Sequence, residues 1–97
     1  MNNEMQAIMI GRKFKANQVC QQPDWNGQDV WLLMFYLPGE EIPCTGYPQY
    51  IVFTGNSYHI TDAEEAMEYL EYLRQNYGFD EDGDLIGYDQ TEPIVIG

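Results

Sequence analysis

Apolar and polar positions along the first half of the chain predict strands and a tight turn. An apolar run at residues 7–10 begins a first strand, which bends or bulges at Gly11 and resumes at residues 16–21. Asn26-Gly27 predicts a two-residue hairpin turn, because a type I′ turn needs a positive φ at both central positions. The eight-residue apolar run at residues 30–37 follows this turn and predicts a central strand.

The second half begins with a segment that excludes regular structure. Residues 38–48 contain three prolines and two glycines, which predicts a long irregular connection. Residues 50–54 and 57–60 then predict a second hairpin, closed by Gly55-Asn56. Near the end of the chain, residues 85–88 and 94–96 predict two further short strands.

One helix is predicted between the second hairpin and these last strands. Thr61 and Glu64 have the spacing of a capping box, and Gly78 is a natural stop signal. Apolar residues in between follow the i, i+3, i+4 rhythm of a single helical face. This expected face comprises Ala63, Ala66, Met67, Leu70, Leu73 and Tyr77.

These elements predict a single α+β domain over residues 1–97: a mostly antiparallel sheet of four to six strands with one main helix packed on one face. The strand at residues 30–37 is apolar on both faces, and a single helix covers only one of them. Three arrangements would cover the other face, and they stay open: a sheet that curls over itself, a homodimer, or a partner-binding surface.

The charge of the chain is unevenly distributed. Three of its four basic residues lie together near the N-terminus: Arg12, Lys13 and Lys15. We interpret this cluster, which also contains Phe14, as a strand edge protected by cations. Residues 16–97 carry fifteen carboxylates against one arginine, a formal charge of −14. Such a surface repels nucleic acid and anionic membranes, and it attracts basic proteins and cations.

The acidic side chains on and beyond the helix form a candidate partner-binding site. We expect it to comprise Glu64, Glu65, Glu68, Glu71, Tyr72, Asp80, Glu81, Asp82 and Asp84. The glutamates step along the helix by ~4.5 to 6 Å, which is comparable with, but does not match, the ~3.4 Å spacing of phosphates along a nucleic-acid strand. Tyrosines, namely Tyr69, Tyr72 and Tyr88, are expected to add contact area. A solvated helix face is the alternative explanation.

Metal and catalytic chemistry have weaker signals. Asp80, Asp82 and Asp84 surround Gly83 as in a calcium loop, but alignment with an EF-hand fails at two ligands, so weak calcium binding is an alternative and no metal or cofactor is expected. His59 is expected to be a packed or surface histidine. Cys20 and Cys44 are expected to be reduced, with a disulfide as the alternative.

In composition the chain resembles the small acidic DNA-mimic proteins that phages and mobile elements use against host nucleases, including anti-restriction and anti-CRISPR proteins, without a motif of any one family. The resemblance implies a non-enzymatic inhibitor that occupies the basic groove of a nuclease or another nucleic-acid-handling protein. No apolar run of about 18 residues and no signal-like N-terminus is present, which predicts a cytoplasmic protein with no membrane partner. A homodimeric structural module is the second interpretation.

Overall fold

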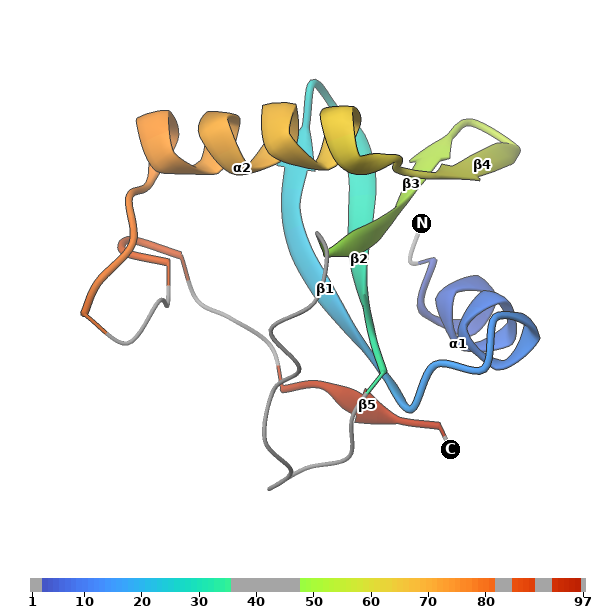
Figure 1. The fold of residues 1–97 in the computed structure, drawn as a ribbon. Coiled ribbons are helices and arrows are strands. Elements are labelled where there is room, and N and C mark those ends of the chain that lie inside the picture. The colour runs from blue at the N-terminus through green and yellow to red at the C-terminus, as the bar shows by residue number, and fades with distance from the viewer. Residues whose placement is uncertain (1–2, 36–47, 82–84, 89–91, 97) are drawn as a thin grey trace.

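The structure is an antiparallel sheet with one helix on each side of it. The computed structural model describes residues 3–35, 48–81, 85–88 and 92–96. Over these residues the elements are α1 (Glu4–Lys13), β1 (Gln18–Trp25), β2 (Gln28–Met34), β3 (Gln49–Thr54), β4 (Ser57–Ile60), α2 (Ala63–Asn76) and β5 (Ile94–Val95) (Figure 1). The strand order is β4-β3-β2-β1-β5. The predicted α+β class and antiparallel sheet are confirmed, and the main helix α2 packs against the sheet as expected.

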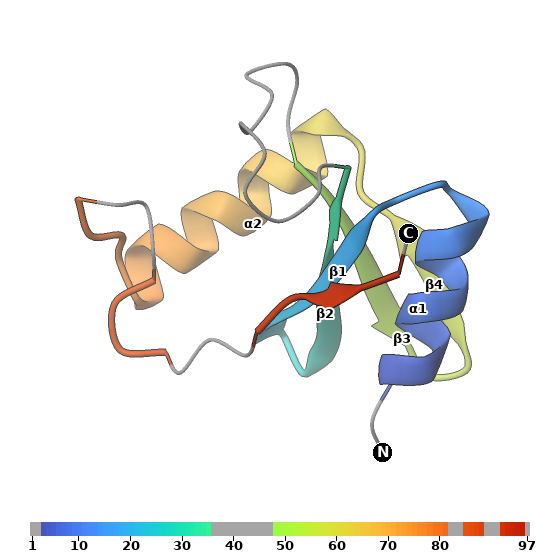
Figure 2. The same cartoon turned by 90° about the horizontal axis from the view of Figure 1, so that it is seen from below.

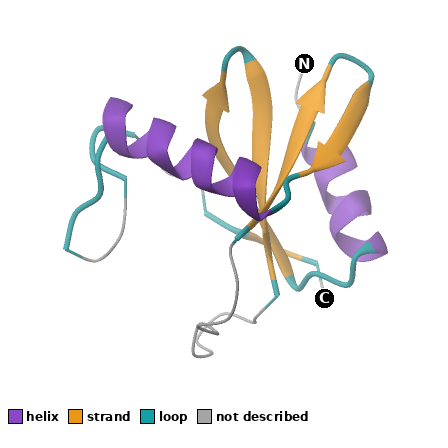
Figure 3. Ribbon diagram, turned by 45° about the horizontal axis from the view of Figure 1, so that its top comes forward, coloured by secondary structure: helices purple, strands orange, loops and turns teal. Residues whose placement is uncertain are grey.

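Both predicted hairpin turns are present. Asn26 and Gly27 have φ values of 53° and 79°, the positive pair that a type I′ turn requires, and they join β1 to β2. Gly55, with φ of 60°, begins the turn between β3 and β4. Because these four strands form a meander, the two turns lie at the same end of the sheet (Figure 3).

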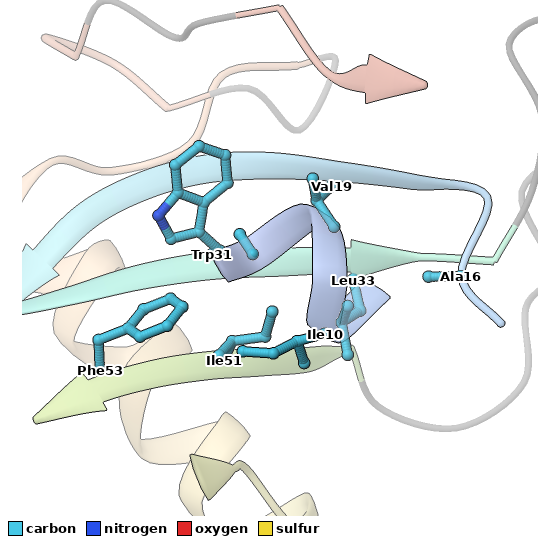
Figure 4. Close-up of a cluster of buried hydrophobic side chains, with 8 residues drawn as sticks. Ile10, Ala16, Val19, Trp31, Leu33, Ile51 and Phe53 are labelled. Carbon is cyan, nitrogen blue, oxygen red and sulfur yellow. The ribbon is translucent and has the colours of Figure 1, made fainter. Parts of the chain in front are cut away.

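Strand β2 is apolar on both faces because each face packs against a different helix. Val30 lies with Tyr69 of α2 in one buried cluster. Trp31 and Leu33 lie in another, which contains Ile10 of α1 (Figure 4). The second face is therefore covered by α1, on the side of the sheet opposite α2 (Figure 2). None of the three arrangements expected from the sequence is what covers it.

Helix α1 replaces the strand predicted at residues 7–10. Ala7, Ile10 and Gly11 are buried and Met9 is exposed, which is a helical rather than an alternating pattern. Gly11 is no bulge: a Cβ atom there would meet the Ile96 side chain and lie 2.9 Å from Val19 Cγ1, so glycine lets α1 approach the sheet closely.

The basic cluster is therefore the end of a helix, and its interpretation as a strand edge is wrong. Arg12 and Lys13 occupy the last turn of α1, where cations complement the partial negative charge of the helix terminus. Phe14 is the C-cap residue. Lys15 follows in the left-handed region, with φ of 63°.

Helix α2 begins one residue later than the capping box predicts. Asp62 is the N-cap residue, and its Oδ1 accepts a 2.8 Å hydrogen bond from the backbone N–H of Glu65. Thr61 is buried instead, and its Oγ1 accepts a 3.0 Å hydrogen bond from the backbone N–H of Tyr50. The predicted stop is confirmed, because Gly78 has φ of 86° and its N–H donates to the carbonyl oxygen of Leu73.

The buried face of α2 is also rotated from the predicted one. Its buried residues are Ala66, Tyr69 and Leu73. Met67 has 51% of its surface exposed, and Ala63 is exposed as well. The tyrosine therefore takes the core position that the sequence pattern assigned to methionine.

The C-terminal part differs from the prediction at one of two strands. Leu85 forms an isolated antiparallel bridge with Phe79 and is followed by a turn, so the strand expected at residues 85–88 is wrong. β5 is confirmed at Ile94–Val95, where it pairs with the beginning of β1. Cys20 is buried in β1, while Cys44 and most of the irregular connection lie outside the described residues.

Candidate functional site

The outer face of α2 carries a stripe of glutamates, which we call the glutamate stripe: Glu64, Glu68 and Glu71. All three side chains are exposed. Their i, i+4, i+7 spacing places them on one side of the helix, opposite the face that carries the buried Ala66 and Leu73. The sequence thus predicted correctly that these three side chains share one exposed face.

Two of the helix glutamates have cationic or polar partners. Glu71 accepts hydrogen bonds from Arg74, at 2.9 Å from its Nε, and from Gln75, at 3.0 Å from its Nε2. The hydrogen bond from Arg74, followed by the one from Gln75, lowers the pKa of Glu71. Glu65 lies at the edge of the stripe and points toward β4, where its Oε2 is 2.7 Å from Nε2 of His59. His59 is exposed, so of the two places expected for it, packed or at the surface, it occupies the surface.

The three N-terminal cations do not neutralise the stripe. Arg12, Lys13 and Lys15 lie at the C-terminal end of α1, on the other side of the sheet (Figure 2). All four Lys and Arg residues of the chain fall within the described ranges, and Arg74 is the one carried by α2. The two faces of the sheet therefore differ in charge: acidic along α2, basic at the end of α1.

The acidic turn beyond α2 is described in part. Asp80 and Glu81 are exposed shortly after the helix ends. Asp82 and Asp84, the other two aspartates of the expected calcium loop, lie outside the described residues. Within the part of the chain that is described, no group of three His, Cys, Asp or Glu side chains could hold a metal ion.

Of the three tyrosines expected at the surface, one lies in the core, and the other two are partly buried against it, so their part in partner contact stays a prediction. Tyr69 is fully buried, and its hydroxyl donates a 2.6 Å hydrogen bond to the carbonyl oxygen of Pro23, so its expected role in partner contact is wrong. Tyr72 is half-buried, with its ring 6.2 Å from that of Tyr69 and 6.4 Å from that of Trp25. Tyr88 packs edge-on against Tyr77.

Comparisons with known proteins add no family to this picture. No family model, curated protein or solved structure matches the chain. Among the helices in the described residues, none has the length and apolar character needed to cross a bilayer.

A hydrogen-bond network around Asp29 is a second feature, and it was not predicted from the sequence. Its Oδ2 accepts from Nδ2 of Asn3 and from Nε1 of Trp31, each at 3.0 Å, and its Oδ1 accepts from Nε2 of Gln21 at 3.4 Å. The donors come from the start of α1, from β2 and from β1. The one signal that could have pointed to it is a charged residue, Asp29, directly before the apolar part of strand β2.

Proposed function

We propose that this chain is a small non-enzymatic binding protein whose glutamate stripe occupies a basic groove on a nucleic-acid-handling protein, in place of a phosphate backbone. The observation that carries the proposal is the exposed stripe itself, set on the face opposite the buried side of α2 and on the other side of the sheet from the N-terminal cations. This arrangement is the charge pattern that a basic groove would attract.

Spacing supports this proposal over general attraction of cations. The stripe residues are separated by about 6 Å and about 4.5 Å along the helix axis, given a rise of 1.5 Å per residue. Phosphates follow one another by ~3.4 Å along each strand of a duplex. Long glutamate side chains have enough reach to absorb the difference, so basic side chains arranged for phosphates would find carboxylates at comparable intervals.

Separation of charge supports it as well. The two helices pack on opposite faces of the sheet, so the whole sheet lies between them. Exposed charges separated by more than a Debye length, about 8 Å at physiological salt, are largely screened from one another. A basic partner approaching α2 would therefore encounter the carboxylates with little repulsion from Arg12, Lys13 or Lys15.

The test compares two variants that lose the same charge. E64Q/E68Q removes two carboxylates from the stripe, and E4Q/E92Q removes two exposed carboxylates elsewhere, on α1 and just before β5. The immobilised wild type should retain basic nucleic-acid-binding proteins from a lysate, and short duplex DNA should release them by competition. The stripe variant should lose this retention and the control variant should keep it.

Two results would contradict the proposal. Equal retention by both variants would mean that net charge, and not the stripe, attracts the captured proteins. Retention that duplex DNA does not compete away would mean that the bound surface is not a nucleic-acid site. Melting temperatures of both variants, measured in parallel, verify that each is folded.

No observation favours a second function. The homodimer was inferred from an apolar sheet face without a cover, and α1 covers that face. The subunit number itself stays a prediction for light scattering. Weak calcium binding likewise stays a prediction, since of its three aspartates only Asp80 lies within the described residues.

A further inference from the structure

A polar depression of about 600 Å³ lies between the two hairpin turns, on the α1 side of the sheet. Glycines of both turns, Gly27 and Gly55, border it, and a Cβ atom built on either glycine would meet nothing within 4 Å. Asn3, just before α1, contributes to one wall. Figure 3 shows both turns at this end of the sheet. The depression is thus open to solvent and formed by three separate parts of the chain.

A carboxylate with a fixed orientation lines this depression. Asp29 is held by three donors, the side chains of Asn3, Gln21 and Trp31. Two of these bonds go to Oδ2, whereas among the described residues Oδ1 receives only the 3.4 Å contact from Gln21. Because an ionised carboxylate offers about four acceptor positions, Oδ1 retains capacity for a further donor. A carboxylate held by its neighbours loses little conformational entropy when it binds.

The remaining walls add a second charge and an aromatic ring. Asp24 is exposed and lines the same depression. Phe53, which is opposite Asp29 in the β2–β3 ladder, contributes to its lining. Two carboxylates beside an aromatic ring favour a cation, and they disfavour an anionic or wholly apolar ligand.

The chemistry of the lining favours an organic cation over a metal ion. A metal would need more anionic or carbonyl ligands than two carboxylates, and no group of three such acidic or metal-binding side chains occurs in the described residues. The amide nitrogens of Asn3 and Gln21 point at Asp29, so they act as donors to the carboxylate. A guanidinium group supplies several N–H donors in one plane, which matches acceptors on two separate carboxylates.

We propose that this depression binds a guanidinium group, through Asp29 and Asp24. The group could belong to a small molecule or to an arginine side chain of a polypeptide, since the recognising chemistry is the same. The site lies on the side of the sheet opposite the glutamate stripe and does not depend on it.

The two tryptophans of the chain provide a direct measurement. The indole N–H of Trp31 donates to Asp29, whereas Trp25 packs against Tyr69 and Tyr72 beneath α2. Titration with propylguanidinium chloride, at constant ionic strength, should shift the Trp31 indole signal in an NMR spectrum to saturation. The Trp25 signal should move little. A capped tripeptide with a central arginine is titrated in the same way. Tighter binding of the tripeptide than of propylguanidinium would indicate a polypeptide ligand, and tighter binding of propylguanidinium would indicate a small molecule.

A charge-matched pair of variants separates the site from the overall negative charge. D24N and E92Q each remove one exposed carboxylate, but Glu92 precedes β5, which pairs with β1 at the end away from the depression. D24N should weaken binding by about two- to fivefold, the range of an exposed ion pair, and E92Q should not change it.

Three results would overturn the proposal. Equal weakening in D24N and E92Q would indicate attraction by net charge alone. An equal response of Trp31 to butanol, which has no charge, would indicate apolar binding. No saturable response to either guanidinium probe would mean that the Asp29 network serves only to anchor the start of α1 and the Trp31 ring.

Discussion

The hydroxyl of Tyr69 donates a 2.6 Å hydrogen bond to the carbonyl oxygen of Pro23, which ties helix α2 to strand β1. Both residues are buried. Tyr69 also meets the ring of Tyr50 edge-on at 4.8 Å and that of Trp25 at 5.2 Å. This side chain therefore holds the helix that carries the glutamate stripe in its place on the sheet.

The first prediction concerns this bond. Y69F should lower the free energy of unfolding by about 1 to 2 kcal/mol, because the carbonyl of Pro23 would stay buried without its donor. Urea unfolding followed by circular dichroism measures the change. Y72F is the matched control: Tyr72 is half-buried in the same cluster, and we expect its loss of a hydroxyl to cost less. Equal effects of the two substitutions would contradict the structural role of the Tyr69 bond.

The second prediction concerns alkaline pH. Burial raises the pKa of Tyr69 and that of Tyr50 above the ordinary value for tyrosine. In the unfolded chain both phenols ionise near pH 10, while in the folded chain they stay neutral, so the unfolded state binds fewer protons above that pH. Stability should hold up to about pH 10 and then fall with rising pH, by up to about 1.4 kcal/mol per pH unit for each of the two tyrosines.

The ultraviolet absorbance of phenolate measures this titration. The chain has eight tyrosines, and those that ionise in the folded state should do so at lower pH than Tyr50 and Tyr69. The absorbance of these two should appear only together with the loss of the folded circular dichroism signal. Complete tyrosine ionisation in a protein that keeps this signal would show that the pair is accessible to solvent.

Local chemistry explains which elements could be predicted from the sequence. The hairpin at Asn26-Gly27 was predictable because two consecutive residues with positive φ need this kind of dipeptide, whatever the rest of the chain does. The end of α2 at Gly78 was predictable for the same reason, because a residue with positive φ ends the helix and glycine adopts that conformation most easily. Such features depend on a few neighbouring residues and hence can be recognised in one sequence.

Tertiary contacts explain what could not be predicted. Residues 7–10 are a short apolar run, which periodicity alone cannot assign to helix or strand. Their helix has no side-chain cap, since Asn3 bonds to Asp29 instead, and its stability comes from packing on the sheet. The depression at Asp29 joins positions 3, 21, 24, 29 and 53, which only the folded chain brings together.

The third prediction tests the close approach of α1. G11A should lower the free energy of unfolding by about 1 kcal/mol, because crowding against Val19 and Ile96 should exceed the better helix propensity of alanine. Chemical denaturation provides the measurement. If Gly11 instead formed a bulge in a strand, as the sequence pattern suggested, G11A would not be destabilised by contact with Val19 and Ile96.

A double-mutant cycle with I96A makes this test specific. The Ile96 side chain is the nearest neighbour of a Cβ atom built on Gly11. I96A alone should destabilise by leaving a void, but in its background G11A should cost less or become stabilising. Additive effects of the two substitutions would mean that residues 11 and 96 do not touch.

The fourth prediction concerns Arg74, the cation that borders the glutamate stripe. Its guanidinium pairs with Glu71 and lowers the pKa of that carboxyl. If the stripe engages a basic groove, Arg74 opposes the partner's cations, so R74Q should increase affinity, by up to about fivefold for one exposed charge. E68Q should change affinity in the opposite direction.

In the R74Q variant the pKa of Glu71, followed by NMR, should rise, because the hydrogen bond that favours its anion is lost. Weaker binding by R74Q would have one of two meanings: Arg74 holds Glu71 in its binding position, or the partner is not basic at this point. The variant E71Q, measured in the same assay, separates the two. E71Q should weaken binding if Arg74 positions Glu71, and it should not weaken binding if the partner is not basic there.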